Sequence, residues 1–543
     1  MTTIAPIAAR RPLDAARPPA PSSGGRPGLA ATLFVGVVVL VCVAILLLTG
    51  QPVVAAAPVL LIGAAVLFWK APVRHTLVLL MGVYLVVSIP PKALPGQNEP
   101  GQGWKSPVYP LYSLLSDNLS KVTHIEALRF SGMELFYLMF LGLILVRVVT
   151  GNRVDAAGRQ PGARAMYVSL AIAFFGVLWL EVWGIARGGD FRQSLWQFRN
   201  LMWLPVLVGV FGYCMRDVRD FRLVAVMMTV AAWLKIMLGL HYMMFVAWPN
   251  GQTPESMTGH EDSVLYVAVL IIWFATWMHH PTWRTFVKTM VTTSLVLTGL
   301  VINNRRIAFV SLLAGLFLAV LMLKGPLKRR IVRTFTYMLP VICLYLLAGR
   351  NRSTGIFKPA SLVMSVSQQK DASSKTRDIE NYNLIQTLKP NKLLGTGWGH
   401  EYNEVSRAYD ISMWFAQYRY IAHNSILWLI SIGGIVGFTL IWLPVSVTIF
   451  LASRSYRFAR TPYDQTVAAS VITVMVTYVV QAWGDMGTQG LGSSLIVAAA
   501  MAASAKLAHA TGAWPAHLRL FGAPRVGRTP TPRQAADAMT QTP

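Results

Sequence analysis

Residues 28–49 read GLAATLFVGVVVLVCVAILLLT, an apolar run without a charged side chain. A bilayer core about 30 Å thick needs about 20 apolar residues in a helix that rises 1.5 Å per residue, so this run can cross a membrane. It is too long for the apolar core of a secretory signal, and no convincing cleavage site accompanies it. We therefore expect a retained first span behind a disordered, basic cytoplasmic tail at 1–27.

The composition of the whole chain agrees with a membrane protein. Of 543 residues, 54% are hydrophobic and 13% are charged, and the mean hydropathy is +0.50. A soluble core of this size could not bury so much apolar surface. The net charge of +26 indicates retained cytoplasmic loops rather than a nucleic-acid partner. The three cysteines all fall in apolar stretches, so no disulfide framework or thiolate metal cluster is indicated.

The remaining apolar runs predict an all-α fold, a polytopic transmembrane helix bundle of about fourteen spans with one large, partly helical extracytoplasmic loop. Each run is bounded by charged residues, proline or glycine. The expected spans lie near 28–49, 52–70, 74–90, 131–149, 165–186, 200–215, 221–247, 262–278, 284–302, 305–323, 331–348, 424–452, 466–484 and 490–509.

Lys and Arg accumulate in alternate connections, which predicts that both termini are cytoplasmic in the inner membrane of a bacterium. The expected organisation is a tail at 1–27, spans 1–11 at 28–348, a large periplasmic catalytic loop at 349–422, spans 12–14 at 423–509 and a second disordered basic tail at 510–543.

Several arginines oppose this charge asymmetry, because the predicted topology places them outside. An outer arginine can meet lipid phosphate, but three groups on that side favour a bound anion. A helix that begins at the outer surface also turns exposed N–H donors and its positive dipole end outward. The groups are Arg187, Arg192 and Arg199 before the sixth span; Arg305 and Arg306 at the start of the tenth; and Arg350, Arg352, Arg377 and Arg419 in the long loop.

The long loop carries a glycine-rich turn at 395–399 with Trp398, and it ends in His423-Asn424 before a span. Aromatic rings at an aqueous surface suit either sugar faces or an interfacial belt, and both interpretations stay open. A histidine at the outer N-terminal end of a helix is kept neutral by the helix dipole, which suits a general base. Asn424 or Ser425 can cap the same helix.

Three stretches together resemble the O-antigen ligase and polymerase superfamily. They are Arg305-Arg306 before an apolar helix; Ser374-x-x-Arg377 followed by Pro390-x-x-x-Leu394-Gly395-x-Gly397; and His423-Asn424 before a span with Gly434 and Gly437. The resemblance covers roughly 190–440. Two departures are Ile432, where members often carry Glu, and the stretch 378–382, where members often carry Trp.

The resemblance implies an inverting, metal-independent membrane glycosyltransferase that acts on undecaprenyl-diphosphate-linked glycans without a cofactor. It assigns His423 as base and Arg199, Arg305, Arg306 and Arg377 as diphosphate or donor contacts. We expect supporting or acceptor roles for Asn424, Arg192 and Trp398. Asp378 or Glu380 could instead pair with Arg377 and make it structural. Expected partners are the lipid-linked donor, a glycan or lipid-linked acceptor and membrane lipids, with polysaccharide export machinery as a further candidate.

Alternatives remain within and outside this class. Polymerisation of an exopolysaccharide, capsule or O-antigen repeat unit is favoured over an O-antigen ligase or protein O-oligosaccharyltransferase, but the residues do not separate them. A polytopic transporter of anionic or glycan substrates would use Lys235 and His241, which are ionisable groups at bilayer depth. We expect no metal site, and the acidic residues of 260–262 suit a helix start without one.

Overall fold

The computed structural model describes residues 29–49, 72–87, 108–116, 130–150, 159–251, 257–259, 261–323, 326–350, 372–407, 417–485 and 487–514, with isolated positions at 58–66, 357–364 and 410. The chain divides into two compact units, 1–66 and 67–543. The first unit contains α1 (Leu29–Thr49), which matches the first expected span. Everything below concerns the second unit.

The described part of the second unit is helical and holds no β-strand, which confirms the all-α prediction. Its α-helices are α3 (Val73–Val87), α4 (Tyr109–Ser116), α6 (Gly132–Val149), α7 (Arg164–Ala186), α8 (Phe191–Cys214), α9 (Phe221–Tyr242), α10 (Asp262–His279), α11 (Trp283–Asn303), α12 (Arg306–Met322), α13 (Pro326–Gly349), α15 (Ala372–Leu388), α16 (Ser425–Phe458), α17 (Pro462–Gly484) and α18 (Leu491–Ala510). Short 3-10 turns lie at Val218–Asp220, Trp248–Asn250 and Lys389–Asn391, and a π-helical turn lies at Met243–Ala247.

The helices follow the expected spans closely. In the part of the chain that the structure describes, nine are long and apolar enough to cross a membrane, and α3 and α12 are shorter apolar helices. Only the expected span at 52–70 falls mostly outside the described residues, and the total of fourteen stays a prediction. The largest difference in a boundary is at α8, which begins at Phe191 rather than near 200, because Asp190 caps it by accepting a hydrogen bond from Gln193 N–H.

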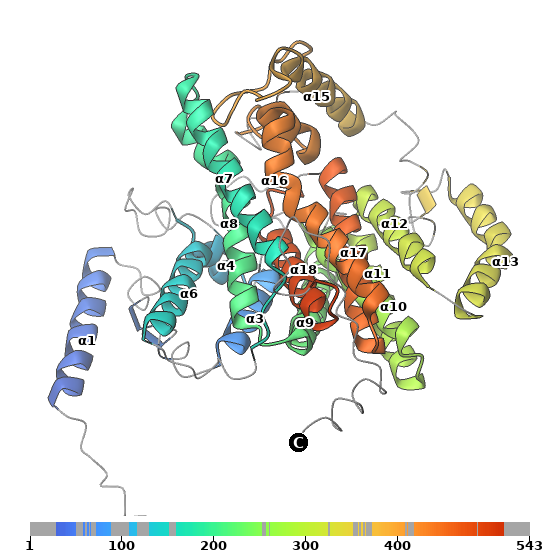
Figure 1. Ribbon diagram of the computed structural model, residues 1–543, viewed down its shortest axis with the longest axis horizontal. Helices are drawn as coiled ribbons and strands as arrows, with labels where there is room; N and C mark the ends of the chain where they lie inside the picture. The colour runs from blue at the N-terminus through green and yellow to red at the C-terminus, as the bar shows by residue number, and fades with distance from the viewer. Residues whose placement is uncertain are drawn as a thin grey trace, which may run out of the picture. The chain divides into compact units, whose positions relative to one another are not determined.

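The centre of the bundle is built from small residues. Nearly all of α18 from Gly492 to Ala508 is buried, and its sequence is mostly Ala, Ser and Gly. Small side chains let helix backbones approach closely, which is the main source of helix association in a membrane. Accordingly α18 packs against α8, α16 and α17, and α16 packs in turn against α7 (Figure 1).

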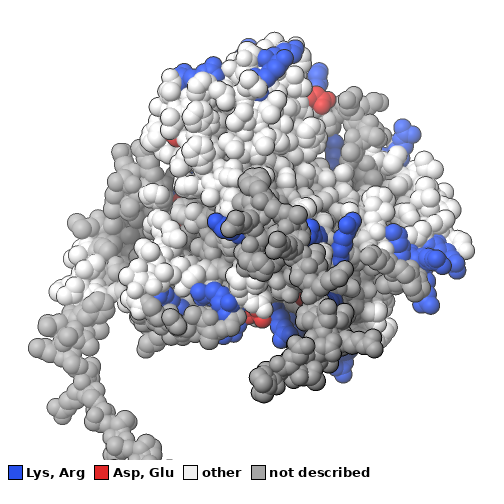
Figure 2. Space-filling model, viewed as in Figure 1, with Lys and Arg blue, Asp and Glu red and all other residues white. Residues whose placement is uncertain are grey.

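Large apolar side chains lie on the outside, as a lipid-facing surface requires. Phe175, Phe317 and Leu344 are each more than half exposed, on α7, α12 and α13. Figure 2 shows Lys and Arg at the upper edge of the visible face and again in its lower half, with a largely uncharged area between them in the centre and on the left, and further basic side chains on the right. This separation of charge is what a membrane-spanning bundle needs.

One glycine-dependent join positions the long loop. Gly434 interrupts α16 with φ 59° and ψ −169°, so the helix ladder breaks there. The freed N–H groups of Ile435 and Val436 donate to Lys392 O at 3.0 Å and Leu393 O at 3.1 Å, and Ile432 O accepts from Gly397 N–H at 2.9 Å. The glycine-rich turn therefore fills the kink of α16 and satisfies its open backbone groups.

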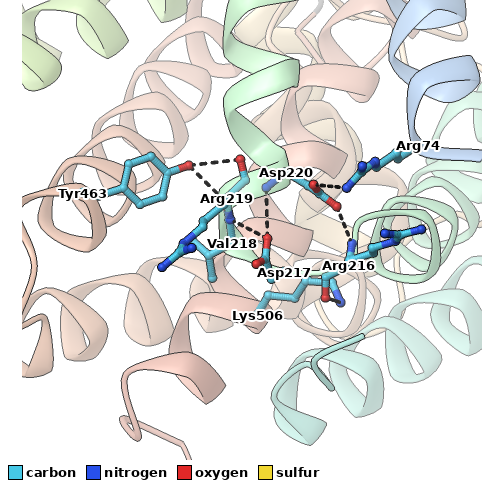
Figure 3. Close-up of polar contacts among 8 residues, drawn as sticks. All are labelled: Arg74, Arg216, Asp217, Val218, Arg219, Asp220, Tyr463 and Lys506. Carbon is cyan, nitrogen blue, oxygen red and sulfur yellow. Dashed lines mark hydrogen bonds and ion pairs between the residues drawn. The ribbon is translucent and has the colours of Figure 1, made fainter. Parts of the chain in front are cut away.

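A polar hub lies at the starts of α3, α9 and α17 and near the end of α18 (Figure 3). It consists of Arg74, Arg216, Asp217, Val218, Arg219, Asp220, Tyr463 and Lys506. Asp220 accepts from Arg74 Nη1 at 2.7 Å and from Arg216 N–H at 2.8 Å. Lys506 Nζ donates to Gln160 O at 2.7 Å, and Tyr463 Oη donates to Val218 O at 3.2 Å. The hub thus joins the starts of α3, α9 and α17 to the end of α18.

Candidate active site

A cavity of about 270 Å³ opens where three helix ends meet. From α15 it is lined by Ser374, Arg377, Asp378 and Asn381; from the start of α16 by His423 and Asn424; and from the end of α17 by Trp483 and Gly484. Two residues predicted from the sequence to act on the substrate, His423 and Arg377, therefore share one pocket although 46 positions separate them (423 − 377).

His423 is held by a carboxylate on α15. Its Nδ1 lies 3.1 Å from Oε2 and 3.3 Å from Oε1 of Glu380, and its backbone N–H donates to Oε2 at 3.0 Å. Because an ionised carboxylate only accepts, Nδ1 carries the proton. The ring nitrogen left for a ligand is Nε2. Asn424 caps α16 by accepting from Leu427 N–H at 3.0 Å, as predicted.

Arg377 contacts the end of α17. Its Nη1 donates to Gly484 O at 2.7 Å, while its buried Nε has no hydrogen-bond partner among the described residues. The alternative pairing with Asp378 or Glu380 does not occur in the described part of the chain, because the Glu380 carboxylate faces His423. A guanidinium with an unused buried donor beside a polar cavity can bind an anion.

The Arg305-Arg306 turn lies beside this pocket. A Cβ atom at Gly484 would lie 2.4 Å from the Ile307 side chain, so the start of α12 touches the pocket wall just after the two arginines. Arg305 is the N-cap residue of α12, and Asn304 before it has φ 56°. Asn303 is buried with its side-chain amide 2.8 Å from Ser263 Oγ, which anchors the turn to α10.

The remaining candidates lie elsewhere. Arg199 makes a two-pronged ion pair with Glu134 on α6, and Trp203 Nε1 donates to the same carboxylate at 2.8 Å. It does not line the pocket. Arg192 is exposed on the first turn of α8. The diphosphate role of Arg199 and the supporting role of Arg192 stay predictions.

Trp398 is wholly buried, so the aromatic surface at the pocket comes from another residue. Its Nε1 donates to Val177 O at 3.0 Å and its ring packs on Trp428 with centroids 5.7 Å apart. In this position Trp398 supports the glycine-rich turn and presents no face to a sugar. Trp483 lines the pocket and is 57% exposed.

A buried phenol lies close to the Glu380 carboxylate. Burial raises the pKa of Tyr402, and the negative charge of Glu380 raises it further. The phenol therefore stays protonated at physiological pH. Tyr402 N–H donates to Arg419 O at 3.1 Å, and Arg419 pairs with Glu404 at 3.0 Å. These contacts connect residues 402–404 to Arg419 close to the pocket.

The sequence analysis missed two residues that line the pocket, Trp483 and Gly484, and the carboxylate behind His423, Glu380. Glu380 was considered only as a partner of Arg377, although both lie on one face of α15 at spacing i, i+3. Trp483 and Gly484 come from a helix about 60 residues beyond His423, and nothing in their local sequence marks them.

Comparison with known proteins supports the family resemblance. Residues 289–442 match the family model described as O-antigen ligase. The match supports the resemblance to the O-antigen ligase and polymerase superfamily. It includes Arg305, Arg306, Arg377 and His423, whereas Trp483 and Gly484 lie beyond it. No curated protein matches the chain. The chain is thus a membrane protein whose residues 289–442 are similar to O-antigen ligase.

In the described residues no group of three or more His, Cys, Asp or Glu side chains could hold a metal ion. Residue 260 of the acidic stretch lies outside the described residues. Asp262 pairs with Lys235 at 2.5 Å, and both side chains are almost fully buried. Lys235, which a transporter would use, is therefore held in an ion pair.

Proposed function

We propose that this protein is a membrane glycosyltransferase that polymerises or transfers undecaprenyl-diphosphate-linked oligosaccharides on the periplasmic face of the bacterial inner membrane. The observation that carries the proposal is the shared pocket of His423 and Arg377, next to the Arg305-Arg306 turn. A neutral base and guanidinium groups are the two kinds of side chain that glycosyl transfer from a diphosphate requires.

In the proposed reaction His423 Nε2 removes the proton from an acceptor hydroxyl. The hydroxyl oxygen then bonds to the anomeric carbon of the donor sugar, from the face opposite the diphosphate, and inverts that carbon. The bond from the anomeric carbon to the diphosphate oxygen breaks, and its electron pair leaves with the lipid diphosphate. Arg377 and the Arg305-Arg306 turn bind the developing negative charge. The diphosphate is a weak base, so no general acid is needed.

The geometry of α17 supports a site on the outer face. Tyr463, in the first turn of α17, belongs to the polar hub, and Gly484, the last residue of α17, lines the pocket. A helix of 23 residues is about 34 Å long, close to the thickness of a bilayer core. The hub carries the excess of Arg and Lys expected inside, so the pocket belongs to the opposite, periplasmic side in this proposal.

The test is transfer in proteoliposomes with a defined undecaprenyl-diphosphate oligosaccharide. His423→Ala should lower turnover about 10²- to 10⁴-fold, the usual contribution of a general base. Arg377→Ala and Arg305→Ala should each lower it strongly through loss of leaving-group stabilisation. Arg407→Ala is the matched control, since this arginine is exposed in the outer segment and does not line the pocket. Full turnover by folded His423→Ala would overturn the proposal.

Within this class we favour polymerisation of repeat units for an exopolysaccharide, capsule or O-antigen. A deletion strain separates the products: single lipid-linked repeat units accumulate when a polymerase is lost, and long unattached chains accumulate when a ligase is lost.

A further inference from the structure

The contact between Glu380 and His423 is more than a local hydrogen bond. One carboxylate accepts from the backbone N–H of His423 at 3.0 Å and from ring Nδ1 at 3.1 Å. Glu380 is only 5% exposed, whereas the imidazole keeps 21% of its side-chain surface accessible at the pocket. The carboxylate therefore lies behind the ring, on the side away from a substrate.

The carboxylate is fixed in place by the docking of α15. Ser431 Oγ on α16 donates to Leu384 O at 3.2 Å, one turn beyond Glu380. Asn383 donates from Nδ2 to Ser406 O at 2.7 Å and accepts from Ser406 N–H at 2.9 Å. These hydrogen bonds hold the backbone of α15 against α16 and Ser406, so the position of Glu380 relative to His423 is fixed by the backbone.

A purely structural carboxylate would need only the backbone N–H of His423. The additional contact with Nδ1 fixes the ring rotation and the tautomer, and leaves Nε2 as the basic nitrogen. A carboxylate on the far nitrogen also stabilises the imidazolium that forms when Nε2 takes a proton.

We propose that Glu380 is the positioning residue of His423: it holds the Nδ1–H tautomer, presents Nε2 to the acceptor hydroxyl and stabilises the resulting imidazolium. This inference rests on the proposed transferase function. The acceptor proton moves to Nε2, the Nδ1 proton stays on the ring, and Glu380 remains ionised throughout.

Other charged groups also surround His423, and they set the background for any pH effect. Arg377 and Asp378 lie on α15, Asp485 follows the end of α17, and the Tyr402 phenol lies next to Glu380. Of the titratable groups among these residues, Glu380 is the one that hydrogen-bonds the imidazole.

Glu380→Gln tests the inference with proteoliposome transfer. A Gln oxygen in the place of Oε2 can still accept from the backbone N–H and from Nδ1–H, but the neutral amide no longer stabilises the imidazolium. We expect kcat to fall about 100-fold with KM nearly unchanged. The acid limb of the pH–rate profile should move to lower pH, because the imidazolium loses its carboxylate. Glu401→Gln, an equal charge change at an exposed carboxylate, should change neither quantity.

Glu380→Asp guards against a folding defect in the Gln variant. It keeps the charge and the acceptor atoms but is one methylene shorter, so it should recover part of kcat and return the acid limb towards its original pH. If His423→Ala abolishes transfer while both Glu380 variants keep kcat and the pH profile, the positioning role is wrong and the proposed function stands. If His423→Ala keeps full transfer, the proposed function itself fails.

Discussion

Gly395 and Gly434 approach each other so closely that neither has room for a Cβ atom. A Cβ on Gly395 would lie 2.5 Å from Gly434 N, and a Cβ on Gly434 would lie 2.6 Å from Gly395 N and 2.3 Å from Leu393 O. Both glycines also have positive φ, 67° and 59°. The loop that carries Arg377 is thus attached to α16, the helix that begins next to His423, at two positions that only glycine can occupy.

Gly434→Ala should therefore destabilise the fold and lower transfer activity. The backbone region of Gly434 costs a residue with a side chain about 1–3 kcal/mol before any clash is counted. We expect a lower midpoint of thermal unfolding in detergent. Gly209→Ala in α8, where an added Cβ would meet nothing within 4 Å, is the matched control and should leave the midpoint unchanged or raise it slightly. An unchanged midpoint for Gly434→Ala would show that the loop is not locked at the kink.

Removing one partner of the Lys235–Asp262 pair should be costly. Both side chains are at most 4% exposed, and Lys235 Nζ also donates to Leu85 O at 3.2 Å. Lys235→Met leaves an uncompensated buried carboxylate, with an expected loss of about 3–5 kcal/mol in the free energy of unfolding. Lys235→Met combined with Asp262→Leu should recover most of it. Additive losses in this double-mutant cycle would contradict a direct interaction.

Stability should fall with rising pH because of Glu261. Burial, followed by the charge of Asp262, raises the pKa of this carboxyl from 4.5 to about 7. The folded protein therefore binds the proton more tightly than the unfolded chain. The free energy of unfolding should decrease between pH 4.5 and about 7, by at most about 3 kcal/mol. Unfolding in detergent at pH 5 and pH 8 measures this change. Glu261→Gln should flatten the profile, and an unchanged slope would exclude Glu261 as its cause.

Labelling of single cysteines tests the orientation. In a variant without Cys42, Cys214 and Cys343, a cysteine at Glu401 should react with a membrane-impermeant maleimide from the periplasmic side. One at Arg460, exposed between α16 and α17, should react only after the inner membrane is permeabilised. The reverse pattern would place the pocket in the cytosol and remove the proposed active site from its substrate.

Much of the fold follows from local sequence, because the length of an apolar run decides whether a helix spans a bilayer. Apart from α15, which lies in the predicted loop, the helices from α6 to α18 lie at the expected ranges with ends shifted by a few residues, and the early start of α8 is the largest shift. That start came from an Asp190 cap, which lies outside the apolar run. The kink at Gly434 could not be predicted from its own span, since the glycine-rich turn that fills it, at 395–399, lies 35 to 39 residues earlier along the chain (434 − 399 and 434 − 395).

Two ionisable residues of the candidate site were predicted from the sequence, and two uncharged residues of its wall were not. His423 and Arg377 were found because a histidine at a helix start and an outer arginine are unusual by themselves. Their neighbours Trp483 and Gly484 come from an apolar span end, which looks like any other. The ion pair of Arg199 with Glu134 also escaped the sequence analysis, because it joins two helices with no shared local pattern.

The hydrogen bond from Arg377 to Gly484 O has a practical consequence for chimeric enzymes. The family match ends at residue 442, and Gly484 lies 42 positions further on (484 − 442). If only the matched segment were grafted into a relative, Arg377 would face the end of the relative's own helix instead of Gly484. A segment exchanged between relatives should therefore extend beyond residue 484, so that Arg377 and Gly484 come from the same protein.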